Sequence, residues 1–408
     1  MIEIMHAIIL DGQLKSALAC VRSLGKAGVT VSVGAERETG MALHSQHASA
    51  RFTYPSPYTH QDAFIRAVKR EAQRLGGKPV VYAFSDATYL SLYSHRTDLW
   101  EYMTLVFPNA TSVEIAFDKA ATYSLARVSG VPTITTYTPE TKEEVSQLSE
   151  TIEYPAVIKT RRSVTWKDGK GIFGSAVFVH NKHELQKIFA TLKQSLGEAP
   201  LIQKLILGEE YGVEMLAKDG AVYALLTHHR IRSLFPTGGS SVLKETMYAG
   251  DLKDTLEEYA KTLVTKLMWS GPIMVEFKVD SDSREPYLME INGRFWGSLP
   301  LSVFAGVDAP YLYYLQATST TLPQELVVAR DGVVSRHFFG DVLHLIRVLF
   351  KRDPMRKLLY PKRRKALRDF LSLPRGTKSD VWSFRDPKPA FFEVVDYFNR
   401  LWHNKKRK

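Results

Sequence analysis

The first part of the chain alternates short apolar runs with longer amphipathic stretches. Strands are expected where four or more apolar residues follow one another, and helices where apolar residues recur every three to four positions. The expected elements, in order, are a strand over 6–12, a helix over 13–28, a strand over 29–36, a helix over 60–77 and a strand over 78–86. This alternation predicts a parallel, helix-covered sheet. We therefore expect an open α/β domain over residues 1–112.

The next two hundred residues rely more on hairpins. One helix is expected over 112–132, ending near Gly130 and Pro132. The following expected elements are a strand over 154–160, two strands around a glycine-rich turn within 161–179, a helix over 180–196, strands within 199–234, a helix over 254–271 and a hairpin within 271–295. Hairpins favour an α+β arrangement with antiparallel pairing.

The last of these hairpins carries acidic and amide side chains inside otherwise apolar strands. Glu276 lies in the run IMVEFKV, and Glu290 and Asn292 lie in YLMEINGRF. Residues 290, 292 and 294 of an extended chain share one face, and pairing of the two strands places Glu276 beside them. Carboxylate and amide oxygens suit Mg²⁺, and neighbouring carboxylates are costly without a cation. The pattern favours a metal site over surface salt bridges.

The glycine-rich turn matches the spacing GxGxxG at Gly169, Gly171 and Gly174. A dinucleotide site requires a helix at the third glycine, whereas SAVFV resembles a strand. A P-loop requires Lys after its last glycine, but Ser and Ala follow Gly174. Two interpretations remain: a hairpin whose backbone N–H groups fold over phosphates, or an ordinary exposed hairpin.

The spaced features over residues 113–318 together resemble the ATP-grasp superfamily of carboxylate–amine and carboxylate–thiol ligases, which includes the large subunit of carbamoyl-phosphate synthase. Lys119, in AFDKAATYSLARVSGVP, resembles the first phosphate-binding lysine of that family. Lys159, in PAVIKT before the glycine turn, resembles the second. The resemblance implies α/β plus α+β architecture in four parts: an N-terminal pre-ATP-grasp domain over 1–112, a subdomain with the glycine flap over 113–200, a subdomain with the adenine hinge and metal site over 201–318, and a basic helical region over 319–408.

The resemblance also implies roles for individual residues. The run QKLILGEE resembles the adenine hinge, which departs from the family in having Gln203 where Glu is common. Gly293 stands where Pro is frequent before the arginine. The implied set is Lys119, Lys159, Gly169, Gly171, Gly174, Gln203, Lys204, Ile206 and Glu210 for ATP, Glu276, Glu290 and Asn292 for Mg²⁺ or Mn²⁺, and Arg294 for phosphate or acyl-phosphate.

The implied reaction is attack of a small-molecule carboxylate on the γ-phosphate of ATP, followed by displacement of phosphate from the acyl-phosphate by an amine. Fixed cations and Mg²⁺ would stabilise the charge that develops. Two alternatives stay open. One is a bicarbonate-activating carboxylase or carbamoyl-phosphate-type enzyme, and the other is a nucleotide-binding, membrane-associated protein without turnover.

The stretch THHRIRSLFPTGGSS is the candidate for binding the second substrate. In a regular strand His228, Arg230 and Arg232 share one face, and His229 lies on the other. That cationic face, followed by a turn over 238–241, would suit an anionic carboxylate or the transferred phosphate. We therefore expect Arg230 and Arg232 to act with Arg294, unless the stretch is a solvated strand edge.

The net charge of +11 belongs to the end of the chain. Residues 351–408 hold 18 Lys and Arg against 6 Asp and Glu, and the remainder holds 36 against 37. Nucleic-acid binding by the main fold is therefore not expected. Helices are expected over 336–350 and at the end, where Phe391, Phe398 and Trp402 lie near one helical stripe. The terminal helix either lies on an anionic membrane or packs on the body with a solvated basic end.

Composition places the chain among globular proteins. Its hydrophobic content is 45% and its only cysteine is Cys20, so an internal disulfide is excluded. Apolar runs are too short for a transmembrane helix. We expect a cytoplasmic location, with peripheral contact at the inner face of the membrane if the tail binds lipid.

Overall fold

The N-terminal part is built on a parallel sheet, as expected. The computed structural model describes residues 5–406 apart from 168, 175 and 320. A four-stranded sheet has the order β3-β2-β1-β4, and all its pairs are parallel. Its strands are β1 (His6–Ile9), β2 (Thr30–Ala35), β3 (Ala50–Thr53) and β4 (Val80–Tyr82). Strand β3 was not expected, because ARFT lacks a continuous apolar run.

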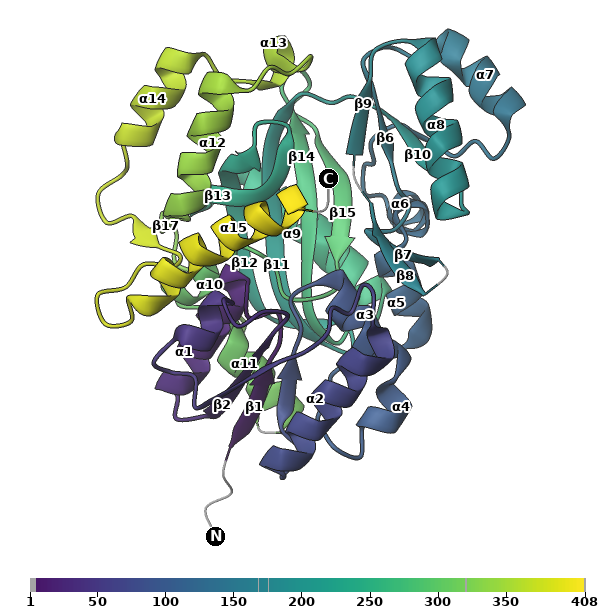
Figure 1. The fold of residues 1–408 in the computed structure, drawn as a ribbon. Coiled ribbons are helices and arrows are strands. Elements are labelled where there is room, and N and C mark those ends of the chain that lie inside the picture. The colour runs from purple at the N-terminus through teal and green to yellow at the C-terminus, as the bar shows by residue number, and fades with distance from the viewer. Residues whose placement is uncertain (1–4, 168, 175, 320, 407–408) are drawn as a thin grey trace.

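Helices cover both faces of this sheet (Figure 1). Successive residues of a strand point to opposite faces. Ile9 accordingly joins the core that contains residues of α1, while Ile8 joins the core that contains residues of α2. The helices of this part are α1 (Lys15–Lys26), the 3₁₀ helix η1 (Met41–His44), α2 (Gln61–Leu75), α3 (Asp86–Ser94) and α4 (Arg96–Leu99). Helix α3 begins directly after β4, at the carboxyl edge of the sheet.

The single helix expected over 112–132 is wrong: the structure has two helices. Helix α5 (Ala110–Phe117) ends at Asp118, whose backbone is extended, and α6 (Lys119–Val128) begins after it. The Asp118 carboxylate accepts hydrogen bonds from the backbone N–H groups of Ala120 and Ala121, which is the geometry of a helix N-cap. The break makes Lys119 the first residue of α6.

The next unit is a small antiparallel sheet of order β5-β10-β6-β9, with α7 and α8 packed on it. Its elements are β5 (Thr136–Tyr137), α7 (Lys142–Thr151), β6 (Ala156–Lys159), β9 (Ala176–Val179), α8 (Lys182–Leu196) and β10 (Leu201–Lys204). Between β6 and β9, the strands β7 (Val164–Lys167) and β8 (Lys170–Phe173) form the glycine hairpin.

The large sheet has the order β15-β14-β11-β12-β13-β17-β18, and β16 pairs with β12. Helix α9 packs in one core with β11 and β14, while α10 and α11 share another core with the N-terminal sheet. The elements are β11 (Gly208–Lys218), β12 (Ala221–Phe235), β13 (Gly238–Thr246), α9 (Asp251–Lys266), β14 (Gly271–Asp280), β15 (Pro286–Asn292), α10 (Leu299–Ala305), α11 (Ala309–Ala317), β16 (Val327–Val328) and β17 (Val334–Arg336). The glycines expected as a turn over 238–241 instead begin β13.

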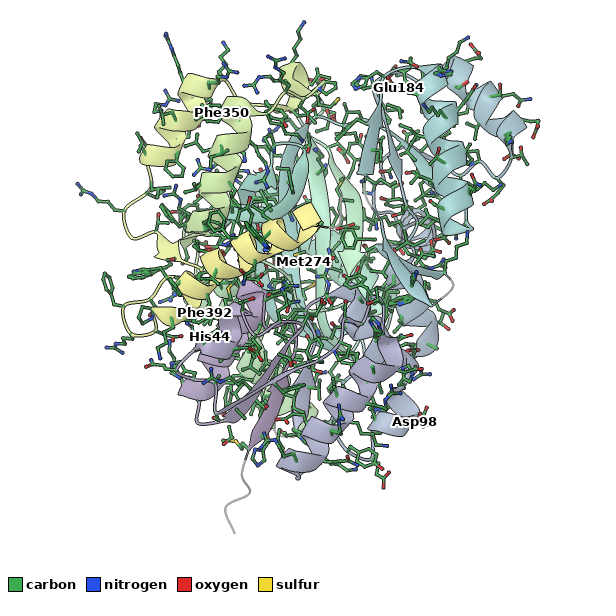
Figure 2. The ribbon with its side chains drawn as sticks, in the orientation of Figure 1. His44, Asp98, Glu184, Met274, Phe350 and Phe392 are labelled. Carbon is green, nitrogen blue, oxygen red and sulfur yellow. The ribbon has the colours of Figure 1, made fainter. Side chains whose placement is uncertain are left out.

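The C-terminal region packs on the body of the molecule. It contains α12 (Phe338–Phe350), α13 (Arg356–Leu359), α14 (Arg363–Leu371), β18 (Lys378–Ser379) and α15 (Lys388–Lys406). Helix α15 lies against η1, where Phe392 stacks on His44 with ring centroids 3.3 Å apart (Figure 2). None of the helices described in the structure is long and apolar enough to cross a membrane. Of the two arrangements expected for the terminal helix, the structure has the one in which the helix packs on the body. The division of the chain into domains remains a prediction.

Candidate active site

The three predicted metal ligands lie together at the β14–β15 hairpin. The strands are antiparallel neighbours, and their register pairs Glu276 with Glu290. The Asn292 Nδ2 atom donates to Glu276 Oε1 at 3.1 Å and lies 3.5 Å from Glu290 Oε1. A register shift directly after Glu276 interrupts the regular pairing at this point. Two carboxylates and one amide therefore converge as the sequence predicted.

Two lysines from different elements face this acidic pair. Lys119 Nζ, at the start of α6, lies 3.5 Å from Glu290 Oε2. Lys159, the last residue of β6, interacts electrostatically with Glu290. Burial lowers the pKa of its ammonium group to about 8, the charge of Glu290 opposes that shift, and the charge of Lys119 adds to it. Burial alone would raise the pKa of Glu290, but the charges of Lys119 and Lys159 outweigh it and lower that pKa.

Arg294 connects the hairpin to the N-terminal sheet. Its guanidinium donates to Asn292 Oδ1 at 2.9 Å and to Asp86 Oδ1 at 2.6 Å. Asp86 is the first residue of α3 and follows β4, so the carboxyl edge of the parallel sheet contributes to the cluster. Sequence reasoning missed Asp86, although ligand-binding residues of open α/β sheets commonly follow the strands.

Arg230 lies between two carboxylates. It donates to Glu210 Oε2 at 2.9 Å and to Glu276 Oε2 at 3.0 Å. The strand order explains this position, because β11 pairs with β12 on one side and with β14 on the other. Lys278 Nζ lies 3.7 Å from Glu210 Oε1 and is a further cation that sequence reasoning missed. The sequence could have indicated Lys278, because it lies two residues after Glu276 on β14 and so faces the same side of the strand.

The structure does not bring Arg232 to this cluster. Its guanidinium forms an ion pair with Asp341 of α12, at 2.9 Å. Register shifts between β12 and β13 fall on either side of Arg232, so the regular alternation that predicted a shared face does not hold there. His228 is fully buried beside Glu214, and His229 stacks on Tyr211 with centroids 4.9 Å apart. Of the predicted cationic face, Arg230 alone reaches the cluster among the described residues.

The glycine hairpin closes onto the N-terminal part. The backbone N–H of Gly171 donates to the carbonyl of Tyr58 at 2.5 Å, and the Phe173 ring meets the Tyr58 ring edge-on at 6.5 Å. A Cβ at Gly174 would lie 1.9 Å from Thr160 Oγ1, which only glycine avoids. Gly169 turns the hairpin with φ +72°. Whether its N–H groups serve phosphates stays a prediction.

The predicted adenine hinge lies where β10 leads into β11. Gln203 is buried and donates through Nε2 to Thr136 Oγ1 at 2.7 Å, while its Oε1 atom is buried without a hydrogen-bond partner in the described part of the chain. The Lys204 side chain points away, pairing with Glu153 at 2.9 Å, so only its backbone can serve the hinge. Ile206 is half-buried in the connection to β11.

The whole arrangement suits a polyanion that arrives with a divalent cation. Five cations surround the acidic residues: Lys119, Lys159, Arg230, Lys278 and Arg294. Among the residues that the structure describes, no group of three or more His, Cys, Asp or Glu is placed to hold a metal ion. The donor set here differs from such a group because it has two carboxylates and an amide.

Comparison with known proteins agrees with this geometry. Residues 198–337 match the family model described as ATP-grasp in the biosynthetic pathway with Ter operon. The carbamoyl phosphate synthase large chain of Pyrococcus furiosus is 23% identical over 211 residues, which are 48% of this chain and 18% of that relative. The chain thus matches less than a fifth of the length of that relative.

Three solved structures share the fold. N5-carboxyaminoimidazole synthetase from Staphylococcus aureus has a TM-score of 0.61 at 18% identity, covering 86% of each chain. Biotin carboxylase from Campylobacter jejuni, in complex with β-γ-ATP, has a TM-score of 0.65 at 17% identity, covering 80% of this chain and 74% of that one. L-amino acid ligase from Bacillus licheniformis has a TM-score of 0.56 at 16% identity, covering 79% and 76%.

The family model covers β11 to β15, which hold the converging acids. The likeness to the solved structures covers 79–86% of the chain. Residues 198–337 thus match an ATP-grasp family, and the comparisons together support the ATP-grasp superfamily for this chain.

Proposed function

We propose that the protein is a Mg²⁺- and ATP-dependent ligase that activates a small carboxylate as an acyl-phosphate and joins it to an amine. The observation that carries the proposal is the meeting of Glu276, Glu290 and Asn292 opposite Lys119 and Lys159. Oxygen donors facing fixed cations are what a metal–triphosphate complex requires.

The residues fit a magnesium ion by their chemistry. The Asn292 NH₂ group lies within 3.1 Å of Glu276 and 3.5 Å of Glu290, so a single metal ion could contact all three side chains. In this structure the amide oxygen accepts from Arg294, and ligation of a cation would need that oxygen on the carboxylate side. Bound there, Mg²⁺ would neutralise charge on the phosphate oxygens. Glu276 and Glu290 would hold it through carboxylate oxygens.

The chain's own residues would position the nucleotide. Lys119 and Lys159 supply ammonium groups for the phosphates, and the hairpin with Gly169, Gly171 and Gly174 would cover them with backbone N–H groups. The Gln203 Oε1 atom, which has no hydrogen-bond partner among the described residues, would accept from an exocyclic amine of the base. Backbone groups of Lys204 and Ile206, which follow Gln203 in the chain, would contact the same base. Glu210, held by Arg230, would accept from the ribose hydroxyls.

Two guanidinium groups would stabilise the reacting oxygens. A carboxylate oxygen of the substrate attacks the γ-phosphorus, the bond to the β–γ bridging oxygen breaks, and ADP leaves. The amine nitrogen then attacks the acyl carbon, loses a proton, and phosphate departs with the acyl C–O bond broken. Arg230 and Arg294 border the acids where this charge develops.

A second candidate is activation of bicarbonate instead of an organic carboxylate. The solved biotin carboxylase and the matching carbamoyl phosphate synthase large chain carry names that favour it. Bicarbonate needs the same nucleotide and metal site, so only the substrate separates the two candidates. The first candidate, ligation of an organic carboxylate to an amine, is supported by the solved L-amino acid ligase.

ADP release from the full chain would test the proposal. Wild-type protein is assayed with Mg²⁺, ATP and a matrix of carboxylates and amines, with a bicarbonate arm, and MgATP binding is measured by calorimetry. Glu290→Gln removes one donor, and Glu285→Gln, in the exposed turn of the same hairpin, is the matched control. Loss of MgATP binding in Glu290→Gln alone supports the site. Binding without ADP release for any pair would favour the non-catalytic alternative.

A further inference from the structure

Positive charge is concentrated on one part of the C-terminal region, which we call the basic lobe: residues 338–371, comprising α12, α13 and α14. Its section from 351 to 369 contains nine Lys and Arg but only two Asp. Both aspartates pair inside the lobe, Asp353 with Lys351 and Asp369 with Lys365. The basic residues are Lys351, Arg352, Arg356, Lys357, Lys362, Arg363, Arg364, Lys365 and Arg368.

The acids that follow the lobe do not offset its charge, because they are directed into the body. Asp380 pairs with Lys15, Asp386 with Arg22 and Asp396 with Arg37. Glu393 pairs with His337. All four acids are buried. The outward face of the lobe therefore remains strongly cationic.

The same lobe exposes large apolar side chains among its cations. Leu371 is 73% exposed and Phe350 is 76% exposed, and Leu358 and Leu367 are also exposed. Leu367 and Leu371 are four residues apart on α14 and so share one face. Figure 2 places Phe350 at the outer end of the lobe, where nitrogen-tipped side chains project outward. Leucines and arginines thus alternate on one solvent-facing helix.

Exposed leucines among exposed cations indicate which kind of partner the basic lobe would bind. A nucleic acid would be bound by cations and stacking rings, and exposed leucines would add nothing. A bilayer with anionic headgroups offers phosphates to the cations and an apolar boundary to the leucines, while long basic side chains can reach back to the headgroups. We propose that the basic lobe binds the surface of an anionic phospholipid membrane, with Leu367 and Leu371 entering the interface.

The proposed contact differs from the terminal helix that the sequence suggested. Helix α15 is held on the body by the Phe392–His44 stack and the Asp396–Arg37 ion pair. Its exposed Phe391 and Phe398 therefore sit on a docked helix. The basic lobe touches α15 through α12, where the Phe339 ring meets the Tyr397 ring edge-on with centroids 5.2 Å apart. Helix α14, which carries Leu367 and Leu371, lies at the outer left of Figure 1. Variants on the two helices can accordingly be distinguished.

Flotation of the full chain with vesicles would test the proposal. The vesicles are phosphatidylcholine alone, or phosphatidylcholine with phosphatidylglycerol. We expect binding only to the anionic vesicles, and weaker binding in added salt. Arg364→Gln/Arg368→Gln should weaken it by roughly fivefold per removed charge. Leu367→Gln/Leu371→Gln should also weaken it, at unchanged charge. The matched controls are Arg66→Gln/Arg70→Gln on exposed positions of α2 and Phe391→Gln/Phe398→Gln on α15.

A second measurement does not depend on how stable these variants are. Cys20 is buried, so a Leu367→Cys variant offers one accessible thiol for an environment-sensitive dye. Its emission should shift to the blue with anionic vesicles, whereas dye on Phe398→Cys should not respond. The proposal is overturned if the α15 controls lose binding and the lobe variants keep it, if no vesicle binds, or if the lobe prefers RNA and the leucine variants bind RNA unchanged.

Discussion

The guanidinium of Arg230 lies 3.0 Å from the carboxylate of Glu276, a residue of the proposed metal site. Lys119 has the same relation to Glu290, at 3.5 Å. Each acid of the candidate metal site thus has its own cation. Burial raises the pKa of Glu276 although Arg230 opposes it. These cations offset the repulsion between the two neighbouring carboxylates.

Replacement of Arg230 should separate its effect on the Mg²⁺ requirement from its effect on the rate of ADP release. In Arg230→Gln we expect a lower Mg²⁺ requirement, because a competing cation is gone. We also expect ADP-release kcat/KM to fall by about 100-fold, since removal of one group that stabilises developing charge typically costs that much. Magnesium titrations at saturating ATP and steady-state kinetics would measure both.

The conservative variant supplies the control. Arg230→Lys keeps the charge but cannot donate to Glu210 and Glu276 through separate nitrogens of one planar group. Its Mg²⁺ requirement should stay near that of wild type while kcat/KM still falls. Equal kinetics for wild type and Arg230→Gln would remove Arg230 from the proposed mechanism.

Nucleotide affinity should depend on the protonation of Lys159. Burial lowers the pKa of this lysine to about 8, so it loses its charge as the pH rises through that value. The charged form binds phosphate, and MgATP affinity should therefore weaken above about pH 8, by at most about tenfold per pH unit. Binding should also take up a proton there, which calorimetry in buffers of different ionisation heat detects.

Arginine at this position should remove the effect. A guanidinium stays protonated throughout this range, so Lys159→Arg should bind MgATP with a flat profile between about pH 7 and 9. A wild-type profile equally flat would contradict the expected loss of charge on Lys159 in this pH range.

Sequence reasoning found most of the acidic site, because that site is local. Glu276, Glu290 and Asn292 sit on two strands joined by a short turn, and pairing of neighbours follows directly. The apolar spacing also located the first parallel strands and α1 and α2. Both inferences need only periodicity and the geometry of adjacent strands.

The failures involve contacts between distant parts of the chain or irregular backbone. Asp86 joins Arg294 across 208 residues, which no local pattern encodes. Arg232 was misassigned because the irregular pairing around it defeats alternation. The break at Asp118 was readable, since aspartate is a strong N-cap, but the apolar residues on both sides suggested one continuous helix.

Gly174 should tolerate no side chain. An added Cβ would lie 1.9 Å from Thr160 Oγ1 and 2.6 Å from the Arg162 carbonyl, at the base of the glycine hairpin. Gly174→Ala should lower the free energy of unfolding by about 1–3 kcal/mol and weaken MgATP binding. Gly297→Ala is the control, because nothing lies within 4 Å of its Cβ position. Urea unfolding and calorimetry compare them; equal stability of the two variants would contradict the expected clash.

Asp380 should be the most important acid for docking of the C-terminal region. It is buried with two ammonium groups: Lys15 at 3.0 Å and Lys244, whose side chain is also fully buried. The charges of Lys15 and Lys244 outweigh burial and lower the pKa of Asp380. Asp380→Asn removes the carboxylate with which both ammonium groups pair, so we expect a loss of about 3–5 kcal/mol in the free energy of unfolding at neutral pH.

The effect of Asp380→Asn on the free energy of unfolding should depend on pH. A carboxylate whose pKa is lowered by folding stabilises the protein above its unfolded pKa and loses that contribution as the pH falls. The difference between wild type and Asp380→Asn, measured by urea unfolding, should therefore shrink below about pH 4. Asp369→Asn, on the outer helix α14, should change stability by less than about 0.5 kcal/mol. A similarly small change for Asp380→Asn would mean that other contacts hold the C-terminal region. If the unpaired ammonium group causes the loss of stability in Asp380→Asn, the double variant Asp380→Asn/Lys244→Met should regain part of that free energy of unfolding.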